Sequence, residues 1–150
     1  MSATTHTEWP STPVPRPVKD LIAKFMDIGD TKSDEAGQRL GYEVFAPDGR
    51  IVVNKRSING AAEIAATHKD QMASIKGRRH RVDKVYTCNE KADDLLLIGS
   101  VERYLHDGRT LVTEWASRLV IENASCEEPR LKLFNAWSDF SEFLAALNGN

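Results

Sequence analysis

The sequence has little of what several familiar protein classes are built from. Its two cysteines, Cys88 and Cys126, are too few for a disulfide framework and lack metal-ligand spacing, so we expect reduced thiols. A formal net charge of -2 argues against a dedicated nucleic-acid binder, whose surface is positive. No apolar run approaches the roughly 20 residues of a membrane-spanning helix. The sequence also has no phosphate-cradling glycine loop and no cluster of metal ligands, so we expect no metal and no cofactor.

The N-terminus lacks the basic and apolar segments of a secretory signal, and this favours a soluble, cytoplasmic protein. With 150 residues, of which 41% are hydrophobic and 28% charged, the chain has the size and composition of one globular domain. Residues 1–16 are rich in Ser, Thr and Pro and predict a flexible arm, while 17–150 form the domain.

Hydrophobic periodicity predicts the elements of that domain. Helices are expected from Pro17 to about residue 28, over 33–40, after the N-cap residue Asn59 and over 140–147. Short strands are expected over 42–45 and 50–54, and long ones over 78–88, 95–106, 109–122 and 130–138. Helices followed by an antiparallel meander indicate an α+β fold, with the helices covering one face of a curved sheet.

Alternation along the strands predicts which side chains face the helices. Read as a two-residue turn, Asp107-Gly108 places Glu102 opposite Thr113. The stretch GRRHRVDKVY at 77–86 then turns its even positions inward and Arg79 and Arg81 outward. A slip of one residue would reverse such an assignment. The expected inner face comprises His80, Val82, Lys84, Tyr86, Ile98, Ser100, Glu102, Tyr104, Leu111, Thr113, Trp115, Ser117 and Leu119.

Four stretches resemble the nuclear transport factor 2-like superfamily, in particular its SnoaL-like enzymes. They are FMDIGD at 25–30, ING..EIA at 58–65, YLHDGRTL at 104–111 and NAWSDFSEFL at 135–144. The resemblance implies a cone-shaped, curved, mostly antiparallel sheet covered by three N-terminal helices, often dimeric through the outer surface of the sheet. The fold hosts many activities, so the resemblance alone does not choose among them.

The resemblance also implies an active site. Dehydratase-like members use an aspartate at the end of the first helix and a histidine on the strand after the third helix, and these positions read Asp27 and His80. Glu102 is the candidate for a second acid or base. The candidates for substrate binding are Tyr104, Trp115, Trp137, Asn135, Arg39 and His68.

These assignments predict a cofactor-independent isomerase, dehydratase or cyclase that acts on a hydrophobic polyketide-, terpenoid- or meroterpenoid-like intermediate, as a homodimer. The alternative is a non-catalytic module of the same fold that binds a ligand or dimerises; a transport carrier is a third, weaker candidate. Each residue also has a structural interpretation: Asp27 as a helix brace, His68 and His80 as buried histidines with satisfied hydrogen bonds, and Glu102 as an arginine partner.

Overall fold

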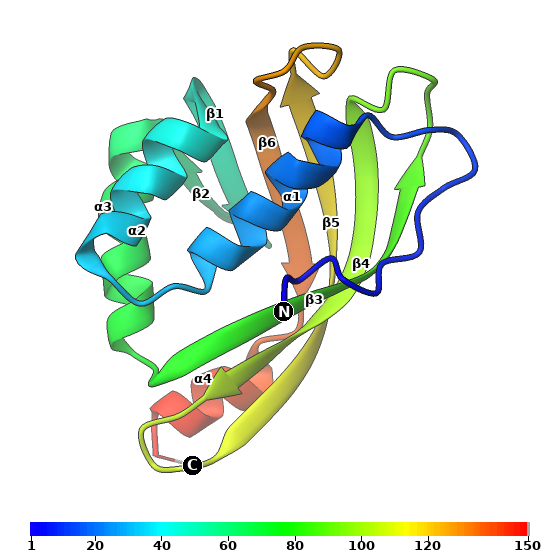
Figure 1. The fold of residues 1–150 in the computed structure, drawn as a ribbon. Helices are drawn as coiled ribbons and strands as arrows, with labels where there is room; N and C mark the ends of the chain where they lie inside the picture. Colours follow the sequence, from blue (N-terminus) through cyan, green and yellow to red (C-terminus); the bar gives the residue numbers. More distant parts are fainter. Residues whose placement is uncertain (150) are drawn as a thin grey trace.

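A six-stranded sheet curves around three helices in the computed structural model, which describes residues 1–149 (Figure 1). The strand order is β2-β1-β6-β5-β4-β3, and every neighbouring pair is antiparallel except β1 and β6. The elements in chain order are α1 (Arg16–Gly29), α2 (Asp34–Arg39), η1 (Leu40–Val44), β1 (Phe45–Val53), β2 (Arg56–Asn59), α3 (Ala61–Ala73), β3 (Gly77–Thr87), β4 (Asp94–Tyr104), β5 (Thr110–Glu122), β6 (Arg130–Ser138) and α4 (Ser141–Leu147). The α+β prediction, with three N-terminal helices over a curved and mostly antiparallel sheet, is confirmed.

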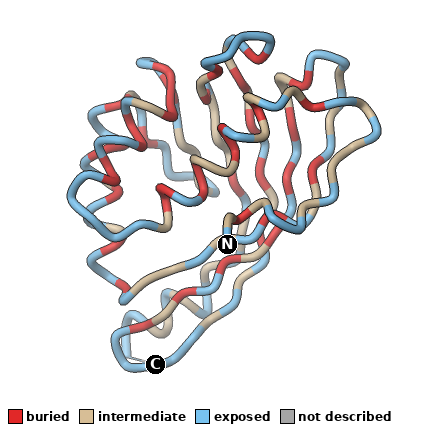
Figure 2. Tube along the Cα trace, in the orientation of Figure 1, coloured by how far each residue is buried: buried red, intermediate tan, exposed pale blue. Residues whose placement is uncertain are grey.

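The core lies between α1 and the concave face of the sheet. Apolar residues of α1 recur every three or four positions, so one helical face is buried, as Figure 2 shows in red. That face packs against buried residues of β3, β4 and β5, among them Val82, Leu97 and Leu119. Burial of each such side chain contributes about 1.5–3 kcal/mol, which fixes α1 across the sheet.

The segment expected as a strand over 42–45 is instead a helical turn. Residues Leu40–Val44 form a single π-helical turn, and β1 then extends through Pro47 and Gly49, although its pairing with β6 shifts register between Phe45 and Arg50. Leu40 and Val44 are both buried while Tyr42 is 58% exposed. Burial four residues apart is the spacing of a helix. A run of only four residues is too short to show whether it is helix or strand, so the pattern alone could not reveal this turn.

The β4–β5 hairpin has a register that differs by one residue from the prediction. Leu105 N donates to Arg109 O, so the loop has three residues, 106–108, and Glu102 lies opposite Val112 rather than Thr113. The inner face of β5 is as expected, with Trp115, Ser117 and Leu119 buried. On β4, however, the odd positions point inward. The predicted inward placement of Ile98, Ser100, Glu102 and Tyr104 is therefore wrong.

A bulge on β3 reverses the alternation partway along the strand. The register shifts between Val82 and Lys84, so His80 and Val82 face inward as expected. Beyond the bulge Val85 is buried and Tyr86 is 43% exposed, and the predicted inward placement of Lys84 and Tyr86 is wrong.

The N-terminal arm lies along the exposed edge of the sheet, where β3 is the last strand. Val82 N donates to Ala3 O, Glu8 N donates to Asp83 O, and Val85 N donates to Glu8 O. Ala3 is also buried. Amino-acid composition suggests a flexible arm because it carries no information about these backbone hydrogen bonds. The arm covers the edge of β3, which would otherwise be open to pairing with other strands.

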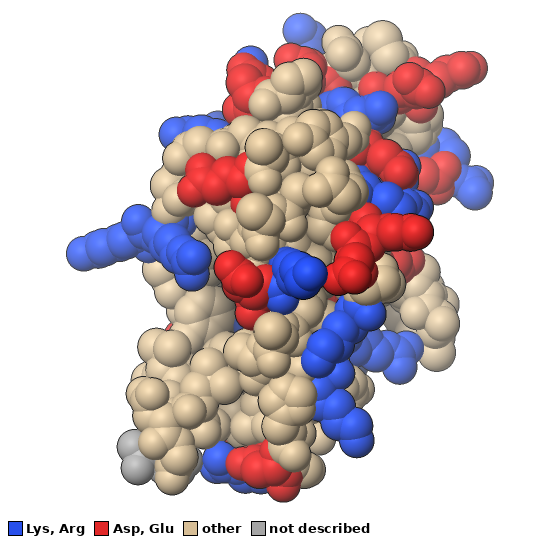
Figure 3. Space-filling model, turned by 90° about the vertical axis from the view of Figure 1, so that its left-hand side faces the viewer, with Lys and Arg blue, Asp and Glu red and all other residues tan. Residues whose placement is uncertain are grey.

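The surface carries no single dominant charge on the side that faces left in Figure 1. Figure 3 shows acidic and basic side chains interspersed over that side. Among residues 1–149, no helix is long and apolar enough to cross a membrane.

Candidate functional site

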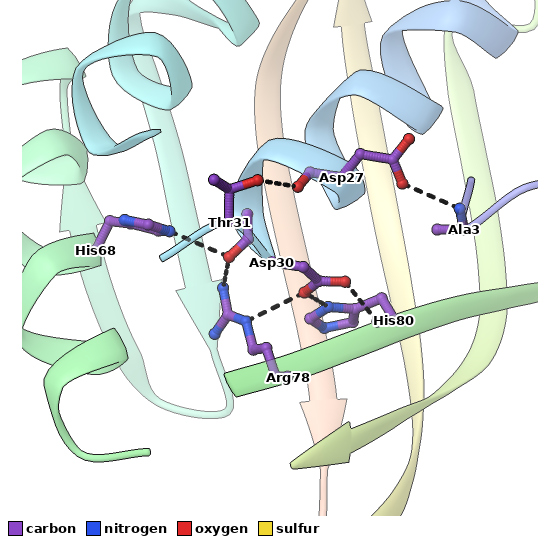
Figure 4. Close-up of polar contacts among 8 residues, drawn as sticks. Ala3, Asp27, Asp30, Thr31, His68, Arg78 and His80 are labelled. Atoms are coloured by element: carbon purple, nitrogen blue, oxygen red, sulfur yellow. Dashed lines mark hydrogen bonds and ion pairs between the residues drawn. The ribbon is translucent and has the colours of Figure 1, made fainter. Parts of the chain in front are cut away.

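The C-terminal end of α1 points at the beginning of β3, and polar groups gather there (Figure 4). The last carbonyls of a helix lack helical partners and carry a partial negative charge. Gly29 O accepts from His68 Nε2 at 3.1 Å and from Arg78 Nη2 at 2.6 Å. Side chains from α3 and β3 thus hold the helix end in place.

Asp30, the residue that ends α1, lies at the centre of this group. Its carboxylate accepts from His80 Nδ1 and from the His80 backbone N, both at 2.5 Å, and from Arg78 Nε at 3.3 Å. An acidic residue is unfavourable at the negative end of a helix. Asp30 is stable there because three donors from β3 surround it.

The pairing of Asp30 with His80 determines the tautomer of the imidazole. An ionised carboxylate can only accept a hydrogen bond, so Nδ1 carries the proton and Nε2 presents a lone pair. Nε2 has no hydrogen-bond partner within residues 1–149. The His80 side chain is 19% exposed, so a small molecule can reach it. A carboxylate, Nδ1 and a free Nε2 in this order form the orienting half of a general base.

The pKa of His80 is lowered from its ordinary value in the folded protein. Burial, which disfavours the imidazolium, is the main cause. Asp30 opposes this effect, while Arg78 and Arg103 add to it by charge repulsion. His80 is therefore neutral at neutral pH, the state in which it can accept a proton.

The wall beside His80 is formed by the inner face of β5. The Trp115 ring lies 6.0 Å from the His80 ring, centroid to centroid. Trp115 Nε1 and Ser117 Oγ are buried without a hydrogen-bond partner in the described chain. Buried polar atoms usually have partners, and enclosed atoms such as these are typically satisfied by buried water. Two shallow hollows of about 350 Å³ each lie elsewhere, at the tip of the β4–β5 hairpin and on the outer face of the sheet.

The expected partner of His80 was Asp27, and the structure places Asp30 there instead. Asp27 accepts from Ser2 Oγ at 2.8 Å and from Ala3 N at 3.0 Å, so it holds the N-terminal arm (Figure 4). Asp27 lies about one helical turn before Asp30, at a rise of 1.5 Å per residue. The segment FMDIGD contains both aspartates. The sequence position of Asp30 could have identified it as the partner of His80. It follows Gly29 at the end of the helix, where a negative side chain is unfavourable unless a residue from another element offsets its charge.

Four other predicted site residues lie on the outer face of the sheet. Glu102 and Tyr104 follow the corrected register of β4, and the Tyr104 hydroxyl donates to Glu102 at 2.7 Å. Asn135 and Trp137 lie opposite Arg118 and Ala116, which alternate with the buried residues of β5. None of the four faces His80, and Trp115 is the one predicted wall residue that does.

The remaining two predicted residues are in different environments. His68 is buried and binds the end of α1, and burial lowers its pKa. Arg39 is exposed and pairs with Glu43 at 3.3 Å. Sequence reasoning missed Arg78, although the alternation that turns His80 inward also turns Arg78 inward.

The lowered pKa values of His80 and His68 predict that the protein loses stability in mild acid. Both groups take up a proton more readily in the unfolded chain, near pH 6.5, than in the folded one. The free energy of unfolding should therefore be fully present above pH 6.5 and decrease below it, by up to about 1.4 kcal/mol per pH unit for each histidine. Urea denaturation between pH 7.5 and 5 measures this slope.

The variants His80→Gln and His68→Gln should each flatten the slope. Stability that stays constant from pH 7 to pH 5.5 in the unmodified protein would contradict the lowered pKa values.

Comparison with known proteins identifies the fold. No protein-family model matches the sequence, and no curated protein matches it. A protein from Jannaschia sp. CCS1 assigned as a SnoaL-like polyketide cyclase superposes with a TM-score of 0.72 at 10% identity, over 94% of this chain and 98% of that one. A ketosteroid-isomerase-like protein from Catenulispora acidiphila, solved with trimethylamine, gives 0.69 at 16% identity, over 91% and 95%. TerC, crystallised with polyporic acid, gives 0.69 at 14%, over 88% and 98%.

These likenesses show that the chain has the nuclear transport factor 2-like fold, as its four sequence stretches predicted. Identities of 10–16% establish the fold and leave the activity to be argued from the site. Among the described residues, no group of three or more His, Cys, Asp or Glu side chains is arranged to hold a metal ion.

Proposed function

We propose that this protein, a member of that fold class by its structure, is a cofactor-independent acid–base enzyme: an isomerase, dehydratase or cyclase of a polyketide- or terpenoid-like intermediate. The observation that supports the proposal is the Asp30–His80 pair, in which a 2.5 Å contact fixes Nδ1 as the donor and leaves Nε2 free. Solved neighbours assigned as a SnoaL-like cyclase and a SnoaL-like isomerase make the same class of chemistry a reasonable starting point.

In the proposed mechanism, Nε2 of His80 removes a proton from a carbon next to a carbonyl group. The imidazolium that forms is stabilised by Asp30, whose carboxylate is held by Arg78. The same imidazolium then returns the proton to another atom of the substrate, or to a leaving group, and His80 is neutral again. One carbon–hydrogen bond is broken and one bond to the returned proton is formed, so the reaction needs no external oxidant or reductant.

Proton abstraction can be detected before the natural substrate is identified. The protein is incubated in D₂O with a panel of aromatic ketones that carry an exchangeable C–H beside the carbonyl, and deuterium incorporation is followed by NMR. We expect incorporation above the buffer rate for at least one ketone. Binding of ketones without any exchange would instead support the non-catalytic ligand-binding module.

We also propose that the protein is a homodimer that associates through the outer face of the sheet. Large apolar side chains are exposed there on neighbouring strands, with Val112 59%, Trp137 46% and Leu96 43% exposed. A patch of this kind is typical of an association surface. Its charged neighbours Arg118 and Asp94 already pair with each other at 2.7 Å, so these two need no partner from a second copy.

Light scattering after size exclusion tests the dimer. We expect a mass twice the 16.8 kDa of one chain. Val112→Asp should shift the protein toward the monomer, because a dimer would bury the new carboxylate. Tyr42→Asp, which alters an exposed aromatic residue on the helical side, should leave the mass unchanged. A monomeric unmodified protein would overturn this proposal without affecting the acid–base site.

A further inference from the structure

Arg103 is a buried cation that forms no direct ion pair in the part of the chain that the structure describes. The residue is 8% exposed and lies on the inner face of β4. Its Nη1 donates to Thr113 Oγ1 at 3.3 Å, and its guanidinium carbon lies 5.2 Å and 4.8 Å from the ring centroids of Phe140 and Phe143. The Nε and Nη2 atoms of Arg103 donate no hydrogen bond within residues 1–149, and neither atom is fully buried. Two donors of this guanidinium therefore remain open.

The charges around Arg103 do not balance. Arg103 lies directly opposite Arg78 in the β3–β4 ladder, and like charges in that arrangement repel. Asp30 is the carboxylate that acts on both, and it already binds Arg78 and His80. With His80 neutral, two guanidinium groups face one carboxylate, and the inner face carries one excess positive charge.

The effect of this environment is visible on Arg103 itself. Burial and, next, the charge of Arg78 lower its pKa to about 10. Arginine is rarely buried without a pair because its charge loses hydration there. A chain that needed Arg103 only for packing could place an apolar residue against Phe140 and Phe143 at lower cost.

We propose that Arg103 binds the carboxylate of an aromatic acid, which is the substrate class of this site. The planar guanidinium offers its two open donors to two carboxylate oxygens, and this pairing supplies the missing negative charge. Phe140, Phe143 and Trp115 supply aromatic surface beside the two polar groups. The assignment rests on the proposed function in one respect, that His80 acts on the same molecule.

The spacing of the strands fits one molecule bound between the two groups. His80 pairs with Val101, so Arg103 is its diagonal neighbour across the ladder. The Cα atoms of diagonal neighbours lie about 7–8 Å apart, so both side chains arise from the same small area of the inner face. A molecule whose carboxylate is bound by Arg103 would therefore lie over the part of the inner face that carries His80.

Binding of 2-naphthoate and its uncharged analogue 2-naphthamide tests the proposal without requiring turnover. Titration is followed by Trp fluorescence and by NMR of the unmodified protein. We expect 2-naphthoate to bind at least tenfold more tightly than 2-naphthamide and to shift the signals of Arg103, Phe140 and Phe143. Arg103→Met should remove the preference, and Arg103→Lys should retain part of it because the charge remains but the paired donors do not.

The matched control is Arg79→Met, which removes the neighbouring arginine that points outward on β3 and should leave the preference intact. Equal affinity for the two probes, or signal shifts confined to other residues, would overturn the assignment, and the NMR readout holds even if Arg103→Met does not fold. The preference should survive in His80→Gln. If 2-naphthoate binds through Arg103 but the protein catalyses no deuterium exchange into any ketone, the proposed catalysis is wrong and the proposed carboxylate site is unaffected.

Discussion

Replacing His80 with glutamine is expected to reduce the rate of proton abstraction by about 10²–10⁴-fold, the usual contribution of a general base. Glutamine can still donate to Asp30 in place of Nδ1, but it offers no nitrogen lone pair comparable to Nε2. Deuterium exchange into the ketone substrate, measured at pH 7.5, reports the loss directly. The pH profile of the unmodified protein should decrease in acid with an apparent pKa below 6.5, because burial lowers the pKa of His80.

Asp27 and Asp30, the two aspartates near the C-terminal end of α1, provide a matched pair for the same assay. Asp30→Asn should reduce exchange strongly, since an amide can present its NH₂ to Nδ1 and favour the wrong tautomer. Asp27→Asn should leave the exchange rate near that of the unmodified protein, because within the described chain the Asp27 carboxylate accepts hydrogen bonds from the N-terminal arm and not from His80. Thermal unfolding separates a catalytic loss from a folding defect. An Asp27→Asn protein as impaired as Asp30→Asn would refute the assignment of Asp30 as the orienting group.

Replacing Gly99 with alanine is expected to destabilise the fold by about 3 kcal/mol, at the upper end of the usual cost of overpacking. Gly99 lies mid-strand in β4, between Val82 and Trp115. A Cβ there would collide with the Arg81 carbonyl oxygen and lie 2.7 Å from the Trp115 ring. The carbonyl belongs to the regularly paired part of β3, before the bulge, and cannot move without breaking the ladder. For a chain of this size, the melting temperature should decrease by roughly 6–12 °C.

Gly77→Ala is the control for this substitution, because it lies in the same strand pair without the collision. The nearest atom to a Cβ at Gly77 is Tyr104 Cδ2 at 3.6 Å, an ordinary contact. Its effect on stability should stay within about 0.5 kcal/mol. Gly99→Ala should also move the Trp115 ring and change its fluorescence. If Gly99→Ala has the same melting temperature as the unmodified protein, β3 and β4 can move apart more easily than the packing indicates.

The helices and long strands could be predicted because each has a strong period of its own. The buried face of α1 repeats every three or four residues, and β5 alternates around Trp115, Ser117 and Leu119. These local patterns bury enough apolar surface to fix the element and its face. The segment Leu40–Val44 was too short to show a period, and its helical turn depends on the neighbours that bury Leu40 and Val44.

The candidate site was predicted only in part, because two single-residue events decide it. A three-residue loop instead of a two-residue turn places Arg103 on the inner face and Glu102 on the outer one. The bulge after Val82 limits the inward alternation of β3 to its first part, which contains Arg78 and His80. Neither the three-residue loop nor the bulge changes the hydrophobic pattern of the sequence enough to be predicted from that pattern.

The stretch of three arginines and one histidine in β3 illustrates the division between sequence and structure. By itself the sequence determined the α+β fold and the inward direction of His80, because period and alternation are local properties. Only the tertiary structure decided that Asp30 and not Asp27 reaches His80, and that Arg103 joins them. The reason is physical: which side chains meet depends on where a helix ends relative to a strand and on strand register, and both are set by packing between distant segments.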